Sequence, residues 1–281
     1  MSGTLFIVAT PIGNLADITH RAIQILKQVD LIAAEDTRHT HKLLQHYGID
    51  TKTISYHEHN EQQRGAELLA RLKEGTDIAI VSDAGTPGIN DPGYRLVRLA
   101  VEHDIPTVSV PGPSALVTAL VASGLPTDEF FFGGFLPARS GARRNRLAEL
   151  RDVPGTLVFY EAPHRLRATL KDAAEVLGAR QAVVARELTK LHEGFRRATL
   201  SELAEHYDNS ETPRGEIVLL IDRNRSEIAA TTKADSDDIA GLVERFESEG
   251  LDHRAALKKA ARELGLSRAE AYRRLVLQRR Q

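Results

Sequence analysis

Short continuous runs of apolar residues recur along this sequence, and segments with helical periodicity separate them. A strand with one solvated face alternates polar and apolar residues, whereas a strand covered on both faces is apolar throughout. The pattern therefore predicts an α/β fold whose strands form largely parallel sheets between layers of helices. The runs are Leu5–Ala9, Ile78–Val81, Thr107–Val110, Leu157–Tyr160, Ala182–Ala185 and Ile217–Ile221.

Loops rich in glycine and proline follow most of these runs. Ligands of open α/β sheets bind outside the carboxyl ends of the strands, so these loops are where a site is expected. Glycine and proline shape tight turns and leave the main chain bare, which suits a ligand held mainly by backbone groups. The alternative is that each loop only turns the chain. The loops are Thr10–Asn14, Ser82–Ile89, Pro111–Ala115 and Glu161–Arg165.

Several classes of chemistry are excluded by what the sequence lacks. Without cysteine there is no disulfide, no thiolate nucleophile and no cysteine-held zinc or iron–sulfur cluster. Neither a G-x-G-x-x-G fingerprint nor a P-loop motif is present, which speaks against a dinucleotide site and a P-loop hydrolase. No apolar run approaches the roughly 20 residues that span a bilayer, and the N-terminus does not resemble a secretory signal. We expect a cytoplasmic protein.

Three regions are predicted along the 281 residues. An N-terminal α/β domain covers 1–114, a second α/β domain covers 115–225, and a small helical domain covers 235–281 after a polar linker. The helical domain resembles a helix-turn-helix and is basic, which suits a polyanionic partner; a small accessory bundle is the alternative. Its basic residues from Leu251 onward are Arg254, Lys258, Lys259, Arg262, Arg268, Arg273, Arg274, Arg279 and Arg280.

Six longer motifs carry a resemblance to a known family. In their order along the chain and in their amino-acid sequence they resemble the motifs of the RsmI family of 16S rRNA cytidine 2′-O-methyltransferases, which lies within the tetrapyrrole methylase superfamily. The match runs from Thr4 to about Asp222, and the helical tail also looks like the family's C-terminal domain. The motifs are Thr10–Leu15, Ala34–Arg38, Ser82–Pro87, Pro111–Ala115, Phe159–Arg165 and Ala185–Lys190.

The resemblance implies a fold, a cofactor and a substrate. It implies a two-domain tetrapyrrole-methylase-like fold that holds S-adenosylmethionine between its domains, and a homodimer. It further implies that the substrate is a decoding-centre cytidine of small-subunit rRNA. The cofactor contacts that it implies are Ile12, Gly85, Thr86, Ile89, Ser114, Ala115, Tyr160, Ala185, Gly215, Glu216 and Ile217.

Methyl transfer to a ribose hydroxyl sets its own chemical requirements. The acceptor oxygen attacks the sulfonium methyl in line, so the two must be held about 3 Å apart. A neutral hydroxyl is a poor nucleophile, and a base, or a cation that stabilises the developing alkoxide, lowers the barrier. The candidate catalytic residues are Glu187, Lys190, Glu161 and His164. The alternative for each is a structural ion-pair network that supports the cleft.

Arginine side chains are the candidates for contact with rRNA phosphates. The segment 139–146 is expected to be a flexible basic loop between two strands, with a merely solvated loop as the alternative. Arg38 follows the apolar segment Leu31–Ala34 and would either meet a phosphate or pair with Asp36. The predicted substrate-binding residues are Arg38, Arg139, Arg143, Arg144, Arg146 and Arg165.

Three rival functions stay open. A small-molecule methylase of the same superfamily would not need the basic tail, and a non-catalytic rRNA or ribosome binder would not need S-adenosylmethionine. A metal-dependent hydrolase would use the H-x-H pairs His39/His41 and His57/His59. No carboxylate cluster completes a ligand set with these histidines, so we expect no metal.

Overall fold

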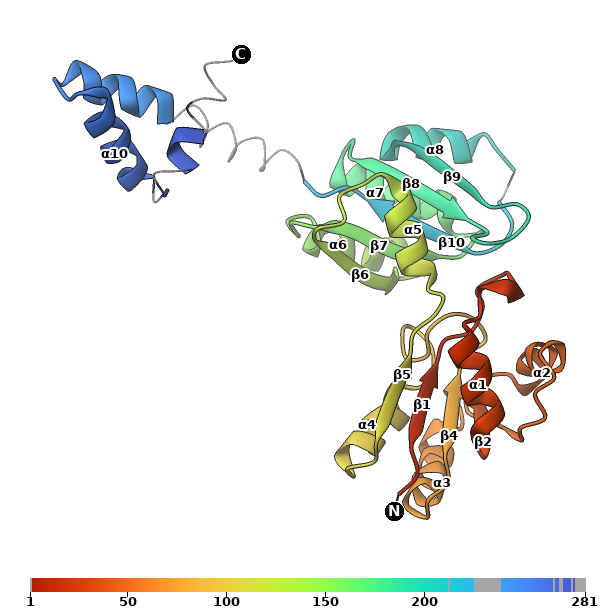
Figure 1. Ribbon diagram of the computed structural model, residues 1–281. Helices are drawn as coiled ribbons and strands as arrows, with labels where there is room; N and C mark the ends of the chain where they lie inside the picture. The colour runs from red at the N-terminus through yellow and green to blue at the C-terminus, as the bar shows by residue number, and fades with distance from the viewer. Residues whose placement is uncertain are drawn as a thin grey trace. The chain divides into compact units, whose positions relative to one another are not determined.

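The structure is a computed structural model that describes residues 2–211, 213–224, 239–264, 266–267, 270–273 and 275. The chain divides into two compact units, Met1–Arg223 and Asn224–Gln281. The larger unit contains two five-stranded sheets with helices packed on them (Figure 1). Among the described helices, none is both long and apolar enough to cross a membrane.

The first sheet is parallel throughout, with strand order β3-β2-β4-β1-β5. Its central strands are apolar along their whole length because helices α1 and α2 pack on one face and α3 and α4 on the other. All the strands therefore end at the same edge, as the apolar runs predicted. The strands are β1 Leu5–Val8, β2 Leu31–Ala34, β3 Thr53–Ser55, β4 Ile78–Val81 and β5 Thr107–Val110. The helices are η1 Leu15–Asp17, α1 His20–Gln28, α2 Thr37–His46, α3 Glu61–Lys73 and α4 Tyr94–Glu102.

The second sheet, of order β6-β7-β10-β8-β9, is mixed, so the expectation of largely parallel sheets was wrong here. Only β6 and β7 run parallel; the other neighbours pair antiparallel. Its inner strands β7, β10 and β8 still carry continuous apolar runs because α5 covers one face and α6, α7 and α8 cover the other. The strands are β6 Phe130–Phe135, β7 Thr156–Glu161, β8 Gln181–Arg186, β9 Gly194–Thr199 and β10 Ile217–Ile221. The helices are α5 Ala115–Ser123, α6 Ser140–Glu149, α7 Leu166–Leu177 and α8 Leu200–Asp208.

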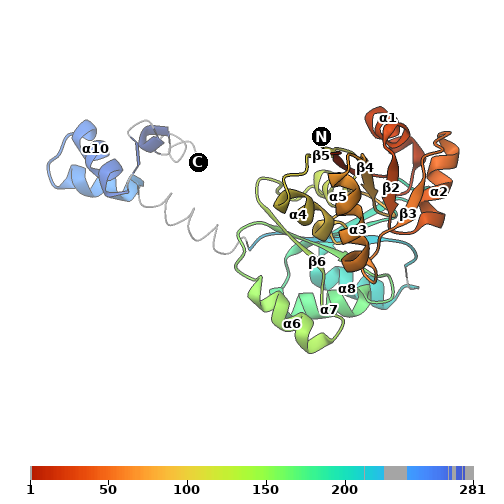
Figure 2. The same ribbon diagram turned by 90° about the horizontal axis from the view of Figure 1, so that it is seen from below.

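Helix α5 connects the two sheets in sequence and packs on the second (Figure 1), and the view from below shows α6, α7 and α8 grouped together on the side away from the helices of the first sheet (Figure 2). It begins directly after the loop that follows β5, and Leu116 and Leu120 pack against Val158 and Val218 of the second sheet. The short connection brings the strand ends of the first sheet towards those of the second. The predicted domain boundaries at 114 and 225 stay predictions.

The smaller unit is helical in its described part, as predicted. A helix covers 239–248, α10 covers His253–Glu263, and residues 270–273 are helical again. Asp252 caps α10 by accepting a hydrogen bond from the Ala255 amide, and Phe246 is buried among alanine and leucine side chains. The predicted start at 235 lies outside the described residues, as do Arg268, Arg274, Arg279 and Arg280.

The expected flexible basic loop at 139–146 does not exist, because this segment forms α6. Arg143 is not available to a phosphate: it is 3% exposed, and its guanidinium binds the Asp172 carboxylate of α7 at 2.6 Å. The Ser140 hydroxyl donates to the same carboxylate. A run of arginines on a helix places one of them on the face that packs against the protein, and here that residue is Arg143.

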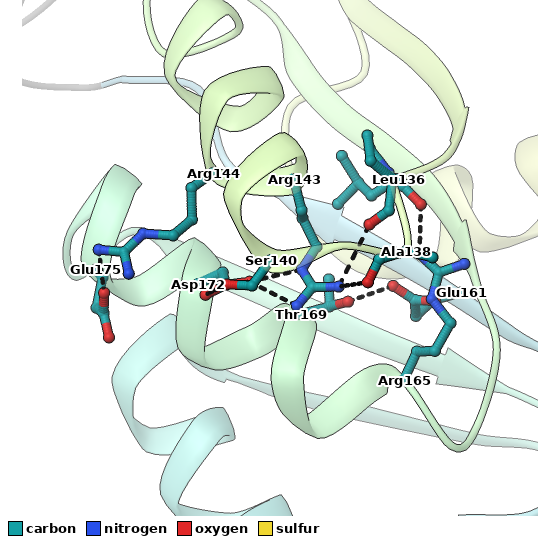
Figure 3. A network of polar contacts seen from close by, with 11 residues as sticks. Leu136, Ala138, Ser140, Arg143, Arg144, Glu161, Arg165, Thr169, Asp172 and Glu175 are labelled. Atoms are coloured by element: carbon teal, nitrogen blue, oxygen red, sulfur yellow. Dashed lines mark hydrogen bonds and ion pairs between the residues drawn. The ribbon is translucent and has the colours of Figure 1, made fainter.

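Two guanidiniums hold the chain that follows β6 (Figure 3). Arg143 Nη1 donates to the carbonyls of Pro137 and Ala138, at 3.3 and 3.1 Å, and Arg165 Nη2 donates to that of Leu136. These carbonyls are satisfied by side chains in place of a neighbouring strand. The network therefore fixes the segment between β6 and α6.

Removal of the Arg143 side chain should destabilise the larger unit strongly. Arg143→Ala leaves the Asp172 carboxylate buried without its cation, and we expect a loss of about 3–5 kcal/mol in the free energy of unfolding. Arg144→Ala is the matched control because Arg144 pairs with Glu175 in solvent, where the two side chains are 48% and 55% exposed. Its loss in the free energy of unfolding should stay below about 1 kcal/mol. Urea unfolding of the two variants measures both, and equal losses would contradict the structural role of Arg143.

Candidate functional site

A cavity of about 250 Å³ opens within the larger unit, where loops from both sheets meet. The loops after β1, β4 and β5 form one side, and the ends of β6 and β7 with the start of β10 form the other. Most of its lining is apolar or backbone. The lining residues are Ile12, Ala84, Gly85, Thr86, Ile89, Asp91, Ser114, Ala115, Phe135, Tyr160, Glu161, Ala162, Pro163, Gly215, Glu216, Ile217 and Val218.

The loops of the first sheet are joined by backbone hydrogen bonds. Thr10 and Gly85 form an isolated antiparallel bridge with N···O distances of 2.9 and 3.0 Å. The Thr10 hydroxyl donates to the Ser82 carbonyl, and the Thr86 hydroxyl donates to the Pro113 carbonyl. Gly85 has φ +78, and a Cβ there would lie 3.4 Å from Ile12 Cγ2. A glycine at this position keeps the main chain open to the cavity.

Aromatic rings form the wall that the second sheet contributes. Tyr160 contacts Phe132 and Phe135 edge to face, with ring centroids 4.9 and 5.8 Å apart. Burial raises the pKa of the Tyr160 hydroxyl, and the charge of Asp91 on the opposite loop raises it further. Asp91 and Tyr160 therefore face the same cavity from different sheets.

All the residues that the sequence predicted as cofactor contacts line this cavity, with the exception of Ala185. Ala185 is fully buried in the core between α5 and the second sheet, so it offers no surface to a ligand. The apolar run that contains it marks the strand β8 itself, which ends one residue later. Whether the others bind the cofactor stays a prediction that their position supports.

Lys190 and Glu187 do not line the cavity but lie together beside its lining residues Gly215 and Glu216, and we call this group the rim. Lys190 Nζ donates to Glu187 Oε1 at 2.9 Å and to Glu216 Oε2 at 3.2 Å. Burial lowers the pKa of Lys190, but the hydrogen bond to Glu187 and the charge of Glu216 outweigh it, so the pKa lies above its usual value. The hydrogen bond from Lys190 holds the pKa of Glu187 below its usual value. Both groups are therefore charged at neutral pH.

The backbone of this rim is unusual. Glu187 and Thr189 have φ values of 51° and 65°, in the left-handed region that side chains other than glycine seldom adopt. The Lys190 side chain lies against Gly13 in the loop after β1, where a Cβ would meet Lys190 Cγ at 2.5 Å. Strained residues persist where surrounding contacts fix them, and such positions cluster at functional sites.

The other predicted catalytic residues have different surroundings. Glu161 is buried, and its carboxylate accepts hydrogen bonds from the Ala162 amide and the Thr169 hydroxyl. His164 is exposed and follows the lining residue Pro163. Arg165 lies 3.4 Å from Glu161 and donates to the Leu136 carbonyl, so it supports the wall of the cavity (Figure 3).

The remaining predicted substrate contacts are on the surface. The Arg38 side chain is 89% exposed and donates two hydrogen bonds to the Asp36 carboxylate; this pairing lowers the pKa of Asp36. Arg139 and Arg144 are exposed, and Arg146 binds Glu149 at 2.8 Å. The four residues keep at least part of their surface open to solvent, and Arg143 does not.

Comparison with known proteins agrees with this geometry. A family model of the tetrapyrrole (corrin/porphyrin) methylases matches residues 4–204. The chain belongs to this family. It is 54% identical to the ribosomal RNA small subunit methyltransferase I of Escherichia coli O157:H7, over 80% of this chain and 79% of that protein. It is 47% identical to the protein of the same name from Micromonospora olivasterospora, over 96% of this chain and 86% of that one.

The fold of this methyltransferase is shared with more distant enzymes. A crystal structure of uroporphyrin-III C-methyltransferase from Thermus thermophilus, complexed with S-adenosylhomocysteine, superposes with a TM-score of 0.55 at 20% identity. The match covers 78% of this chain and 97% of that one. This likeness confirms the predicted tetrapyrrole-methylase fold. The relatives at 47% and 54% identity confirm the resemblance to the rRNA methyltransferase family.

The sequence analysis missed several lining residues of the methyltransferase. Asp91 lies in the same loop as Gly85 but beyond its recognised motif, and Phe135 ends a strand whose run of aromatic residues was not assigned. The position of Asp91 after β4 was the signal that could have revealed it. Asp91, Phe135 and Val218 lie outside the predicted loops, whereas Ala84, Ala162 and Pro163 lie within them but were not named as contacts.

The histidine pairs do not form a metal centre in the described part of the chain, where no group of three or more metal-binding side chains occurs. His39 and His41 lie on α2, two residues apart, so they point to different faces of the helix. The His57 ring binds the Asn60 side chain instead.

Gly215 is the glycine of the cavity whose replacement should matter most. Its φ is +85, and a Cβ would lie 2.0 Å from Glu187 Oε1, so Gly215→Ala must displace the rim. We expect binding of S-adenosylmethionine, measured by calorimetry, to weaken by about tenfold or 1.4 kcal/mol. Gly124→Ala is the control, because Gly124 has φ +80 with open space around it. If both variants bind alike, the contact with Glu187 does not shape the site.

Proposed function

We propose that this methyltransferase transfers a methyl group from S-adenosylmethionine to the ribose 2′-hydroxyl of a decoding-centre cytidine in small-subunit rRNA. The observation that carries the proposal is the identity of about half of all residues, over most of the chain, with proteins named ribosomal RNA small subunit methyltransferase I. A ribosomal substrate implies action in the cytoplasm.

The cofactor is S-adenosylmethionine, and the cavity fits it by its chemistry. Gly85, Thr86 and Gly215 offer main-chain groups, while Ile12 and Ile89 offer apolar surface to an adenosine. A mainly apolar pocket with a few polar groups is the usual form of a small-molecule site. When bound, S-adenosylmethionine supplies an electrophilic methyl group on a sulfonium. The residues of the cavity bind and orient it.

Exposed arginines support an rRNA substrate. Arg139 and Arg144 at α6 and Arg38 at α2 present guanidiniums to solvent, and the exposed face of α10 adds Arg254 and Lys258. Phosphate contacts of this kind position a nucleic acid without reading its sequence. The ion pairs with Asp36 and Glu175 are exposed and weak, so phosphates can replace these carboxylates.

A homodimer is part of the proposal, as the family resemblance implies. Helix α5 is apolar on all sides, yet Val117 and Val121 are 51% and 70% exposed. A helix that is apolar all round is normally buried. A second copy of the chain would cover this surface.

The decisive experiment is transfer of labelled methyl from S-adenosylmethionine to small ribosomal subunits that lack the modification, followed by alkaline hydrolysis of the rRNA. A 2′-O-methyl group blocks cleavage at the adjacent bond, so we expect the label in an alkali-resistant dinucleotide. Label on a base would refute the ribose acceptor. Cofactor binding without any transfer to the subunit would favour a small-molecule methylase.

Lys190 should affect methyl transfer more than cofactor binding. Lys190→Ala removes the cation between Glu187 and Glu216, so the rim loses its charge balance and the contact that holds Glu216 at the cavity. We expect the turnover rate to fall by at least about tenfold, with a smaller loss of cofactor affinity in calorimetry. Lys171→Ala is the control, since Lys171 pairs with Asp208 on the surface. Turnover equal to the parent would remove Lys190 from the mechanism.

A further inference from the structure

Three carboxylates line the cavity, and two of them are already engaged. Glu161 has no exposed side-chain surface, and its oxygens accept hydrogen bonds from Ala162 and Thr169. Glu216 is paired with the Lys190 ammonium. The third is Asp91, which does not take part in any of the ion pairs found among the described residues. Among the described residues, Asp91 is therefore the lining carboxylate without a cationic partner; it forms a hydrogen bond with Ser82, and a carboxylate can accept more than one.

The backbone holds Asp91 at the cavity. Asn90, directly before it, has φ +64, and its side chain lies against Gly134 of β6, where a Cβ would meet Asn90 Oδ1 at 2.5 Å. Pro92, directly after it, restricts the chain on the other side. The contact between Asn90 and Gly134 joins the loop after β4 to the second sheet. The Asp91 carboxylate is thus placed by both sheets, opposite Tyr160.

The groups around Asp91 favour its protonated form. Burial raises its pKa to about 6, and the charges of Glu35 and Asp83 contribute to the rise, while a hydrogen bond with Ser82 opposes it. Glu35 follows β2, Ser82 and Asp83 follow β4, and Tyr160 faces Asp91 from β7. The carboxylate is ionised at pH 7 to 8 but has a higher proton affinity than an ordinary aspartate.

We propose that the Asp91 carboxylate accepts the proton of the hydroxyl that receives the methyl group. The hydroxyl oxygen loses its proton to Asp91 Oδ as its bond to the methyl carbon forms and the carbon–sulfur bond breaks, and the sulfonium becomes a neutral thioether. The proton later passes from Asp91 to solvent. The inference rests on the proposed function, and it adds the residue that takes the proton.

The earlier candidates suit this role less well. Lys190 is protonated at neutral pH, and the carboxylate of Glu187 is held by Lys190 and by the Glu216 amide at 3.1 Å. A general base works best when its pKa lies near the working pH, and positioned bases contribute about 10² to 10⁴ in rate. Lys190 and Glu187 are then positioning residues of the rim, which hold Glu216 and the start of β10.

Replacement of Asp91 by its amide tests the role in turnover. Asp91→Asn keeps the size and one acceptor oxygen but cannot take a proton, so we expect turnover at pH 8 to fall by about 100-fold or more. Calorimetric affinity for S-adenosylmethionine should change by less than about threefold, or 0.7 kcal/mol. Glu102→Gln, which removes a carboxylate from the exposed end of α4, should leave both values unchanged. Equal losses of turnover and affinity would make Asp91 a cofactor ligand and overturn the inference.

A titration without turnover gives an independent readout. In protein labelled with ¹³C at the aspartate carboxyl carbons, the signal that Asp91→Asn removes should titrate with a midpoint near pH 6. Glu35→Gln removes a neighbouring negative charge, so the midpoint of Asp91 should move to lower pH, and the acidic limb of the rate profile should move with it. A titration midpoint of Asp91 near pH 4 would overturn the inference. An acidic limb of the rate profile that stays at the same pH in Glu35→Gln would also overturn it.

The two proposals fail in different ways. If the parent protein does not methylate small subunits, the proposed function fails, while the titration of Asp91 still shows whether the carboxylate has the expected proton affinity. If the parent protein methylates rRNA and Asp91→Asn does so equally well, only the inference about Asp91 fails.

Discussion

The backbone bridge between Thr10 and Gly85 is the contact on which the site depends. It joins the loops after two neighbouring parallel strands, β1 and β4, so their bare main chain lies side by side. Helix α5 then brings the second sheet to the same place, because it begins directly after the loop of β5 and packs on β7 and β10. The cavity is the space left between loops held in this way. A site built from backbone needs such fixed loops, since it has few long side chains to adapt to a ligand.

The arginines at α6 and after β7 fall into two groups: buried or half-buried ones support the fold, and exposed ones are open to a partner. Arg143 and Arg165 lie inward and bind three successive carbonyls, so they replace a strand that the sheet lacks. Arg139 and Arg144 lie outward, where their charge is open to a polyanion. A buried guanidinium whose carboxylate and carbonyl partners saturate it cannot also bind a phosphate. The arginine-rich segment is therefore both a structural support, through the buried Arg143, and a candidate binding surface, through the exposed Arg139 and Arg144.

The carboxylates at the strand ends show how position sets proton affinity. Asp36 beside Arg38 has a lowered pKa, whereas Asp91, buried near Glu35 and Asp83, has a raised one. Two aspartates that follow strands of the same sheet thus have pKa values shifted in opposite directions. A cavity that receives a cationic cofactor benefits from negative charge, and a carboxylate of raised pKa in that cavity is suited to accept a proton.

The sequence by itself determined the α/β class, the apolar strands and the loops that form the cavity, because continuous apolar runs and glycine-rich turns are local properties. It also predicted most of the residues that line the cavity, but its further candidate Ala185 does not line it, because β8 buries that side chain under α5. The antiparallel pairing of the second sheet was decided by the tertiary structure. A strand covered by helices on both faces is apolar throughout whether it pairs parallel or antiparallel, so its sequence does not reveal the direction of pairing. Only the folded chain revealed that Arg143 is buried and that Asp91 reaches the cavity, because both depend on contacts between residues distant in sequence.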